Sequence, residues 1–279
     1  MNKKVIWITG ASSGIGKSLA LKFAKEGWIV AASARREDLL QDLNKENSNI
    51  YSFPLDVTNI ENCKNTFNKI LDQFKEIEIS FFCTGIHDPK SEKKFSLEKI
   101  KKITEVNYFG TLNCINSVYD YYNQKQSGQI SIVSSVAGYR GLPASGAYCA
   151  SKSALSSFAE SLHFEMKRKN VRISLISPGF IKTPMTDMND FPMPMIKTPE
   201  FAADEIYKGL IKIKSFEIHF PKSFTFIMKL LRILPNSIYF KIVEKGMSKI
   251  KYKSFTKKTF NSATLKPNIV IKDLMIAKI

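Results

Sequence analysis

Two side chains that could move a proton lie four residues apart in the segment "YCASK": Tyr148 and Lys152. On a helix, residues four apart share a face, with Cβ atoms about 5–6 Å apart. An ammonium group at that spacing would favour the tyrosinate. The same spacing recurs at Tyr121 and Lys125, in a chain with ten tyrosines, so spacing alone does not select a site.

A glycine-rich turn near the start of the chain could bind an anion. The segment "TGASSGIG", residues 9–16, places Gly10, Gly14 and Gly16 between a short apolar run and a segment of helical periodicity. Glycine permits a tight turn and close backbone approach, and a helix N-terminus offers unpaired N–H donors with partial positive charge. The segment therefore predicts a pyrophosphate site; the alternative is a plain strand-to-helix turn.

The end of the second predicted strand carries arginines where a dinucleotide-binding unit presents its ribose-reading residue. The segment is "SARRED", and Arg35 is the first choice for the contact, with Arg36 beside it. An acid there would repel a 2'-phosphate, whereas arginine binds one, so the predicted cofactor is NADP(H). The alternative is a solvated pair at a helix start. Asp56, after the third strand, either accepts from the adenine amino group or caps the helix beginning near Thr58.

The composition favours a globular protein without a metal site. The chain has 279 residues, 44% hydrophobic and 24% charged, enough for a sizeable core. Its four cysteines form no CxxC pair and its three histidines no ligand spacing, which predicts reduced thiols in the cytoplasm and no metal. The opening "MNKKVIWITG" is interpreted as a strand rather than a leader, and no apolar run approaches the roughly 18–20 residues of a membrane span.

Apolar runs alternate with segments of helical periodicity along the chain. This alternation predicts an α/β fold, a doubly wound parallel sheet with helices on both faces. The expected strands are "KVIWIT", "WIVAAS", "IYSFPL", "EISFFC", "QISIVS", "VRISLIS" and "FEIHF", and the expected helices lie within 14–27, 59–74, 97–122 and 147–170.

With these motifs in order, the sequence resembles the short-chain dehydrogenase/reductase family over roughly residues 3–221. The resemblance rests on "TGASSGIG" at 9–16, "LDV" at 55–57, Asn107 in "VNYFG", "SIVSSVAG" at 131–138, "YCASK" at 148–152 and "SPGFIKT" at 177–183. The family's catalytic serine ends a strand 13 residues before its tyrosine, which selects Ser135 with Tyr148 and leaves Tyr121 without a partner. One departure is "FCTG", which keeps only Gly85 of the family's Asn-Asn-Ala-Gly run.

The resemblance implies a Rossmann fold and an oxidoreductase that interconverts a carbonyl and an alcohol. Tyr148 would exchange the proton, Ser135 would hold the substrate oxygen, Lys152 would bind the nicotinamide ribose, and Asn107 would order a water. Because free tyrosine has a pKa of about 10, the Lys152 ammonium and the nicotinamide cation must favour the phenolate. The implied cofactor-binding residues are Gly10, Ser12, Ser13, Gly14, Ile15, Gly16, Arg35, Arg36, Asp56, Gly85, Tyr148, Lys152, Pro178, Gly179, Ile181 and Thr183.

The segment after the sixth strand is expected to shape the substrate site. By resemblance, Phe180 and Ile181 would lie along the nicotinamide, and Thr183 would bond its carboxamide. The stretch "MTDMNDFPMPMIKTPE", rich in Met and Pro, predicts a mobile lid with an apolar lining, and hence an apolar, lipid-derived substrate. A variable surface loop is the alternative. A homo-oligomer formed through residues 97–123 and 147–169 is expected by resemblance only.

A basic extension, residues 222–279, is expected to follow the Rossmann domain of residues 1–221. It carries 13 Lys/Arg against two acids, +11 of the chain's +17. Within "SFTFIMKLLRIL", Thr225, Lys229 and Arg232 share one helical face, which predicts either an interfacial helix on anionic lipid or packing over the cleft or a second subunit. The expected location is cytoplasmic, with peripheral contact at the inner membrane surface through residues 222–260.

Two other functions fit parts of this sequence. A non-catalytic nucleotide-sensing or membrane-attached scaffold would keep the cofactor site without turnover. A nucleic-acid tether would use the basic extension, but the chain has no helix-turn-helix or zinc motif. The four tetrad positions favour the enzyme.

Overall fold

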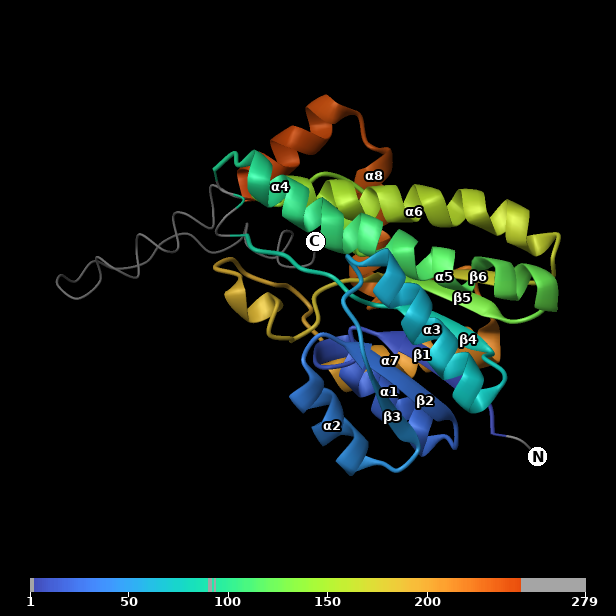
Figure 1. Ribbon diagram of the computed structural model, residues 1–279. Coiled ribbons are helices and arrows are strands. Elements are labelled where there is room, and N and C mark those ends of the chain that lie inside the picture. Colours follow the sequence, from blue (N-terminus) through green and yellow to red (C-terminus); the bar gives the residue numbers. More distant parts are fainter. Residues whose placement is uncertain (1–2, 90–91, 93, 247–279) are drawn as a thin grey trace.

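A single seven-stranded sheet organises the chain. The computed structural model describes residues 3–89, 92 and 94–246 (Figure 1). All neighbouring strands are parallel, in the order β3-β2-β1-β4-β5-β6-β7. The strands are β1 (Val5–Thr9), β2 (Ile29–Ala34), β3 (Ile50–Pro54), β4 (Ile79–Phe82), β5 (Gln129–Val133), β6 (Arg172–Pro178) and β7 (Glu217–Phe220). All seven predicted strands and the doubly wound fold are confirmed.

The order of the strands creates a crevice between β1 and β4. The chain runs outward from β1 through β2 to β3, then returns to β4 on the other side of β1 and proceeds to β7. Loops leaving β1 and β4 therefore diverge at the carboxyl edge of the sheet, where open α/β sheets bind their ligands. The glycine turn follows β1, and the "FCTG" segment begins at the end of β4.

Helices cover both faces of the sheet, because both faces of its strands are apolar. In Figure 1, α5 and α6 lie along one side of the sheet, and α1 and α2 along the other. The first side also carries α3, and the second α7. Their bounds are α1 (Gly14–Lys25), α2 (Glu37–Glu46), α3 (Ile60–Phe74), α5 (Gly110–Lys125), α6 (Gly146–Lys167) and α7 (Pro199–Tyr207).

The helices differ from the predicted set in three places. The sequence prediction omitted α2 and α7, which are only ten and nine residues long. The segment predicted as one helix from 97 to 122 is divided into α4 (Leu97–Thr104), a π-helical turn (Glu105–Phe109) and α5. A π-helical turn often marks a functional position, and this one contains Asn107.

Helix α8 (Lys222–Ile233) packs beside β7 and the turn that follows β5, and residues 236–246 after it are helical as well. Its Phe224 and Met228 form a small core with Val136 and Tyr139. Arg140 fixes the end of α8 by donating to the carbonyls of Leu231, at 2.8 Å, and Leu234, at 2.6 Å. In the described part of the chain, no helix is both long and apolar enough to cross a bilayer.

Candidate active site

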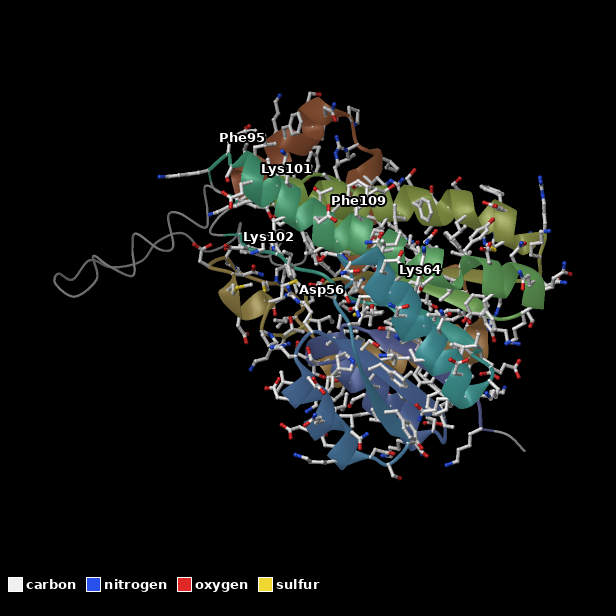
Figure 2. The ribbon with its side chains drawn as sticks, in the orientation of Figure 1. Asp56, Lys64, Phe95, Lys101, Lys102 and Phe109 are labelled. Carbon is white, nitrogen blue, oxygen red and sulfur yellow. The ribbon has the colours of Figure 1, made fainter. Side chains whose placement is uncertain are left out.

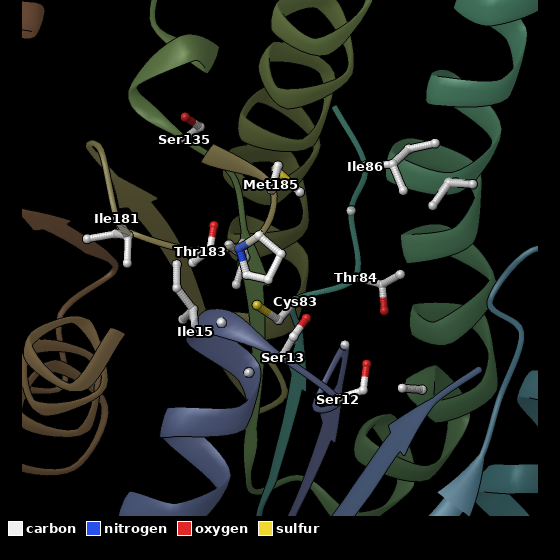
Figure 3. Close-up of a pocket in the computed structure, with 18 of the residues that line it drawn as sticks. Ser12, Ser13, Ile15, Cys83, Thr84, Ile86, Ser135, Ile181, Thr183 and Met185 are labelled. Atoms are coloured by element: carbon white, nitrogen blue, oxygen red, sulfur yellow. The ribbon is translucent and has the colours of Figure 1, made fainter. Parts of the chain in front are cut away.

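One cleft at the carboxyl edge of the sheet gathers the predicted site. It has a volume of about 320 Å³ and runs from the glycine turn to the start of α6. Figure 3 shows Ser12 and Ser13 towards one end of this cleft and Ser135 towards the other. Each of the 16 residues predicted to bind the cofactor lines it, from Gly10 in the first turn to Thr183 after β6. The structure therefore brings segments that are distant in sequence to one site.

The glycine turn is tightly packed against its own backbone. A Cβ atom on Gly16 would lie 2.3 Å from the carbonyl oxygen of Gly10, closer than real side chains approach. Gly10 has φ of +70°, and a Cβ there would lie 3.0 Å from the Thr84 nitrogen. These positions require glycine, and α1 begins at Gly14 with its N–H groups at the cleft. The turn is built to let a polyanion approach the backbone.

Arg36 is held directly over the glycine turn. Its guanidinium donates to the hydroxyls of Ser12, at 2.8 Å, and Ser13, at 3.0 Å. Arg35 also lines the cleft, and both arginines are exposed. Of the two, Arg36 is therefore the one whose position is fixed by hydrogen bonds among the described residues, although Arg35 was the first choice from the sequence.

Asp56 closes the turn after β3 and does not cap α3. Its Oδ1 accepts from the Thr58 N–H at 3.0 Å and from the Thr58 hydroxyl at 2.8 Å. The cap of α3 is Asn59, whose side chain accepts from the Asn62 N–H. Asp56 also lines the cleft, so the helix-cap alternative is wrong and an adenine contact stays a prediction.

Tyr148 and Ser135 lie at the same end of the cleft. Ser135 follows β5, and its Oγ accepts from the Ala137 N–H at 3.1 Å, which fixes the turn that presents it. Burial raises the pKa of Tyr148 to about 12, while a hydrogen bond with Ser135 opposes that rise. The phenol is therefore protonated at neutral pH and able to donate.

Lys152 lies one helical turn beyond Tyr148 and is almost fully buried. Its Nζ donates to the Val133 carbonyl at 2.8 Å and lies 5.8 Å from the centre of the Tyr148 ring. Burial lowers the pKa of the ammonium to about 8. A fixed amine with this pKa can change its protonation near physiological pH.

Asn107 lies behind the cleft and does not line it. Its side chain accepts from the Ile86 N–H at 2.7 Å and donates to the Ile86 carbonyl at 3.0 Å and to the Ser151 hydroxyl at 3.1 Å. Both amide hydrogens are thus used within the protein. Asn107 ties the loop after β4 to α6, at the residue before Lys152.

The "FCTG" departure leaves the edge of β4 braced by other groups. The Thr9 hydroxyl accepts from the Cys83 N–H at 3.2 Å and joins the ends of β1 and β4. Cys83 lines the cleft, and its burial raises the pKa of the thiol to about 11, against the opposing charge of Lys152. The thiol is therefore neutral and adds no competing nucleophile.

The second Tyr-Lys pair has a structural role at the opposite edge of the sheet. Tyr121 accepts from the Ile77 N–H at 2.9 Å, and Lys125 donates to the Ile77 carbonyl at 3.0 Å and pairs with Glu76 at 2.8 Å. Tyr121 and Lys125 lie at the end of α5, and their partners Glu76 and Ile77 precede β4, at the strand end away from the cleft. Of these two tyrosines, Tyr148 is the one that lines the cleft, and its catalytic role stays a prediction.

Some placements differ from the sequence prediction. Phe180, expected beside the nicotinamide, instead packs against Phe224 and Phe191, with ring centres 5.4 and 6.1 Å apart. Its neighbour Ile181 does line the cleft. Lining residues that the sequence prediction did not select include Cys83, Thr84, Ile86 and Val106, whereas Met185 and Thr186 belong to the segment predicted to line the substrate site. Cys83 and Thr84 follow β4, which pairs with the strand before the glycine turn, and this position in the sequence could have indicated that they line the cleft.

The protein has a doubly wound parallel sheet with a glycine turn at the crevice between β1 and β4. These two features define the class of dinucleotide-binding Rossmann proteins. Within that class, the chain belongs to the short-chain dehydrogenase family, whose model matches residues 4–191.

Known relatives agree with this assignment. An uncharacterised oxidoreductase of Myxococcus xanthus is 30% identical over 243 residues, 86% of this chain and 96% of that protein. A dehydrogenase/reductase SDR family protein 7-like of Dictyostelium discoideum is 36% identical over 197 residues, 66% of this chain and 61% of that protein.

Solved structures share the fold over most of the chain. The structure of ElxO with NADP bound has a TM-score of 0.69 and 26% identity, covering 78% of this chain and 97% of that one. A short-chain dehydrogenase from Streptomyces avermitilis has a TM-score of 0.74 at 19% identity, covering 91% and 99%. The second likeness concerns the fold alone.

Proposed function

We propose that the protein is an NADP(H)-dependent oxidoreductase that interconverts a carbonyl and an alcohol on an apolar, lipid-derived substrate. The observation that carries this proposal is the arrangement of Ser135, Tyr148 and Lys152 in one cleft with the glycine turn. A proton donor, an oxygen-binding hydroxyl and a buried amine beside a dinucleotide site are the groups such a reaction needs.

The residues of the cleft fit the proposed cofactor. The Gly10–Gly16 contact leaves the backbone open to a pyrophosphate, and α1 adds its N-terminal N–H groups. Arg36, held by Ser12 and Ser13, and Arg35 would bind a 2'-phosphate, for which an acid would be unsuitable. The NADP bound to ElxO, 26% identical, supports this preference. NADP(H) would supply or accept the hydride.

The proton chemistry follows from the positions of three side chains. In reduction, Tyr148 would donate its phenolic proton to the carbonyl oxygen, and Ser135 would hold that oxygen by a hydrogen bond. In oxidation these roles reverse. Lys152, fixed to the Val133 carbonyl, would hold the nicotinamide ribose and, when protonated, favour the tyrosinate. Asn107 would act by holding Ile86 and Ser151, and the water-ordering role predicted for it stays a prediction.

An apolar substrate is supported by the lining of the cleft near Tyr148. Ile86, Val106, Ile181 and Met185 line it, and Figure 3 shows Ile86 and Met185 among the side chains around it. Met185 begins the Met- and Pro-rich segment, which forms a short 3₁₀ turn at Thr186–Met188 and is otherwise non-helical until α7 begins at Pro199. The irregular backbone expected there is confirmed, and its role as a lid is part of the proposal.

The test begins with NADPH and NADH titrated against the full chain by fluorescence, followed by turnover of hydrophobic ketones and aldehydes. Tight NADPH binding, weak NADH binding and turnover abolished by Tyr148→Phe with binding intact are the expected results. NADPH binding without turnover of any carbonyl would favour the nucleotide-sensing scaffold. Binding of neither nucleotide would refute both.

We further propose that α8 and the residues after it contact an anionic membrane surface. The orientation of α8 supports this, because its polar side faces the protein. Thr225 is buried against His219, at 2.6 Å, and Lys229 pairs with Glu217 at 2.5 Å. The face of α8 that carries Thr225 and Lys229 is therefore turned toward the protein.

The outward side of α8 is apolar and is surrounded by basic residues. Phe226, Leu230 and Ile233 are 70%, 53% and 75% exposed, at helical spacings of four and three. Exposed Ile238, Phe240 and Ile242 follow, and the exposed basic residues nearby are Lys222, Arg232, Lys241 and Lys245. Residues 222–279 carry 13 basic residues against two acids. Apolar side chains among cations match an anionic lipid interface, and we propose peripheral attachment of a cytoplasmic protein at the inner membrane surface.

Sedimentation with phosphatidylglycerol and phosphatidylcholine vesicles tests this contact. We expect binding to anionic vesicles only, and its loss in a Phe226→Glu/Ile233→Glu variant. The matched control is Phe95→Glu, an exposed phenylalanine before α4 (Figure 2). If the double variant instead breaks a dimer and vesicle binding is unchanged, a second copy covers α8. If the full chain is retained on DNA and a chain truncated after Pro221 is not, the nucleic-acid alternative is supported.

A homo-oligomer through α5 and α6 is also proposed. Phe164 on α6 is 71% exposed, and Phe109, at the start of α5, is exposed too (Figure 2). Large apolar side chains on neighbouring helices are typical of an interface between subunits. Phe164→Glu should convert the protein to monomer in analytical ultracentrifugation; an unchanged mass would refute this interface.

A further inference from the structure

A histidine outside the predicted site is stacked on Tyr148. His87, in the loop after β4, has its ring centre 4.4 Å from that of Tyr148, with an angle of 31° between the planes. The His87 side chain is only 9% exposed. The orientation of the Tyr148 ring is therefore set in part by an imidazole that the sequence pattern gave no reason to select.

Glu92 connects this histidine to the helix that carries Tyr148. Its Oε1 lies 3.4 Å from His87 Nε2, and its Oε2 accepts from the Ala147 N–H at 2.8 Å, while the Tyr148 N–H also stabilises the carboxylate. The Glu92 side chain is 6% exposed. A carboxylate at a helix N-terminus is favoured by the helix dipole, so Glu92 fixes the first turn of α6.

The facing atoms of the two side chains are otherwise unsatisfied. In the described ranges, His87 Nε2 and Glu92 Oε1 are buried and make no hydrogen bond. A small closure of their 3.4 Å separation would pair them, and a buried carboxylate and imidazole each need a partner. Such a pair is costly in an apolar core, and here it lies against the proton-donating tyrosine.

Burial and nearby charges act on the protonation of both His87 and Glu92. Burial lowers the pKa of His87, and the Asp88 carboxylate opposes this. Burial raises the pKa of Glu92, with the N–H groups of Ala147 and Tyr148 opposing and Asp88 adding to the rise. Burial is the main cause of the raised pKa values of Tyr148 and of the Cys149 thiol, and the charge of Glu92 adds to both. The N–H groups of the first turn of α6 thus favour the charged form of Glu92 against the effect of its burial.

We propose that His87 and Glu92 act together as a positioning pair that holds the Tyr148 ring in its working orientation and keeps a negative charge beside it. This inference rests on the proposed function. Glu92 places the backbone of Tyr148, His87 places its ring, and the carboxylate keeps the phenol protonated and ready to donate in the reduction direction.

The pH dependence of alcohol oxidation tests the charge. Oxidation needs the tyrosinate, so kcat/KM rises with pH as Tyr148 loses its proton. Glu92→Gln keeps an oxygen for the Ala147 N–H but removes the charge, and should move this rise to lower pH by about one unit. His87→Phe keeps a ring over Tyr148 but leaves Glu92 unpaired, and should lower kcat about tenfold at unchanged NADPH affinity. The double variant should recover part of that loss, because the unpaired charge is gone.

A readout without turnover tests the contact itself. The chain has three histidines, so His87→Phe identifies the His87 signal in nitrogen NMR of the full protein. Glu92→Gln should move the titration of His87 to lower pH, since the carboxylate favours the imidazolium. An unchanged titration would overturn the pairing of the two side chains.

The failure of this inference and of the proposed function are distinguishable. Tyr148→Phe turning over as fast as the natural chain would refute the proposed function. If Tyr148→Phe is inactive while Glu92→Gln and His87→Phe keep the natural pH profile and only melt at lower temperature, the pair is merely structural and the inference is wrong.

Discussion

The ammonium of Lys152 donates a 2.8 Å hydrogen bond to the carbonyl oxygen of Val133, the last residue of β5. Ser134 reinforces the same junction, because its hydroxyl donates to the Lys152 carbonyl at 2.8 Å. The strand end and α6 are thus joined on both sides of Lys152. The amine cannot leave the cleft without breaking this bond, and its burial is the cause of its lowered pKa.

Lys152 should lower the stability of the protein at neutral pH. Its pKa is about 8 in the folded protein against an ordinary 10.5, so the unfolded chain binds more protons between these values and stability rises with pH across them. At about 1.4 kcal/mol per unit, keeping the buried ammonium charged costs about 3 kcal/mol below pH 8. The hydrogen bond from Lys152 to the Val133 carbonyl offsets part of this cost, because such a bond contributes about 1 kcal/mol to stability.

Lys152→Met should therefore be about 2 kcal/mol more stable than the natural chain at about pH 7, and about 1 kcal/mol less stable above about pH 10.5. Urea unfolding at several pH values measures the difference, and Lys45→Met, at an exposed lysine of α2, is the control. A difference that is constant with pH would show that the folded amine titrates normally.

Arg36 should determine the choice between NADPH and NADH. Because Ser12 and Ser13 hold its guanidinium over the glycine turn, Arg36→Ala should weaken NADPH binding at least tenfold and leave NADH binding unchanged. Arg35→Ala should have a smaller effect. Fluorescence titration gives both affinities, with Lys45→Ala, in the last turn of α2, as the control. An equal loss for the two nucleotides would mean that Arg36 supports the turn rather than reading the phosphate.

Gly16 should be indispensable for cofactor binding. An added Cβ would lie 2.3 Å from the Gly10 carbonyl, so Gly16→Ala must displace the turn. We expect NADPH affinity to fall at least tenfold and the free energy of unfolding by about 1–3 kcal/mol. Gly141→Ala is the matched control, since nothing lies within 4 Å of its Cβ position. Normal NADPH binding by Gly16→Ala would show that the turn can relax.

The fold could be predicted from the sequence because its signals are local. Buried parallel strands are continuous apolar runs, and all seven were visible as such. The helices that were missed are short: α2 has only Leu40 and Leu43 buried, too few to mark a periodicity, and α7 is recognisable mainly by its Thr198 cap and Pro199. The π-helical turn at Asn107 is accompanied by a tertiary bond to Ile86, 21 positions earlier, which no local pattern contains.

The site was predictable where a motif supplied its residues and unpredictable where packing did. Every predicted cofactor-binding residue lines the cleft, because the turns after parallel strands meet at one edge. The orientation of Phe180 depends on Phe224, 44 positions later, and the contact of His87 depends on Glu92 and α6. Likewise, periodicity identified two faces of α8, but only contact with Glu217 and His219 decides which one turns inward.

Asn107 should act through structure rather than through a free amide. Asn107→Ala leaves the Ile86 backbone and the Ser151 hydroxyl without their partners, which should lower the free energy of unfolding by about 3 kcal/mol and kcat at least tenfold. Asn113→Ala is the matched control, because Asn113 donates one bond of 3.0 Å to the Val57 carbonyl and should cost about 1 kcal/mol. Chemical unfolding and steady-state turnover of the two variants measure both effects. If Asn107→Ala loses turnover but keeps its stability, the side chain takes part in proton transfer directly, as the water-ordering role requires.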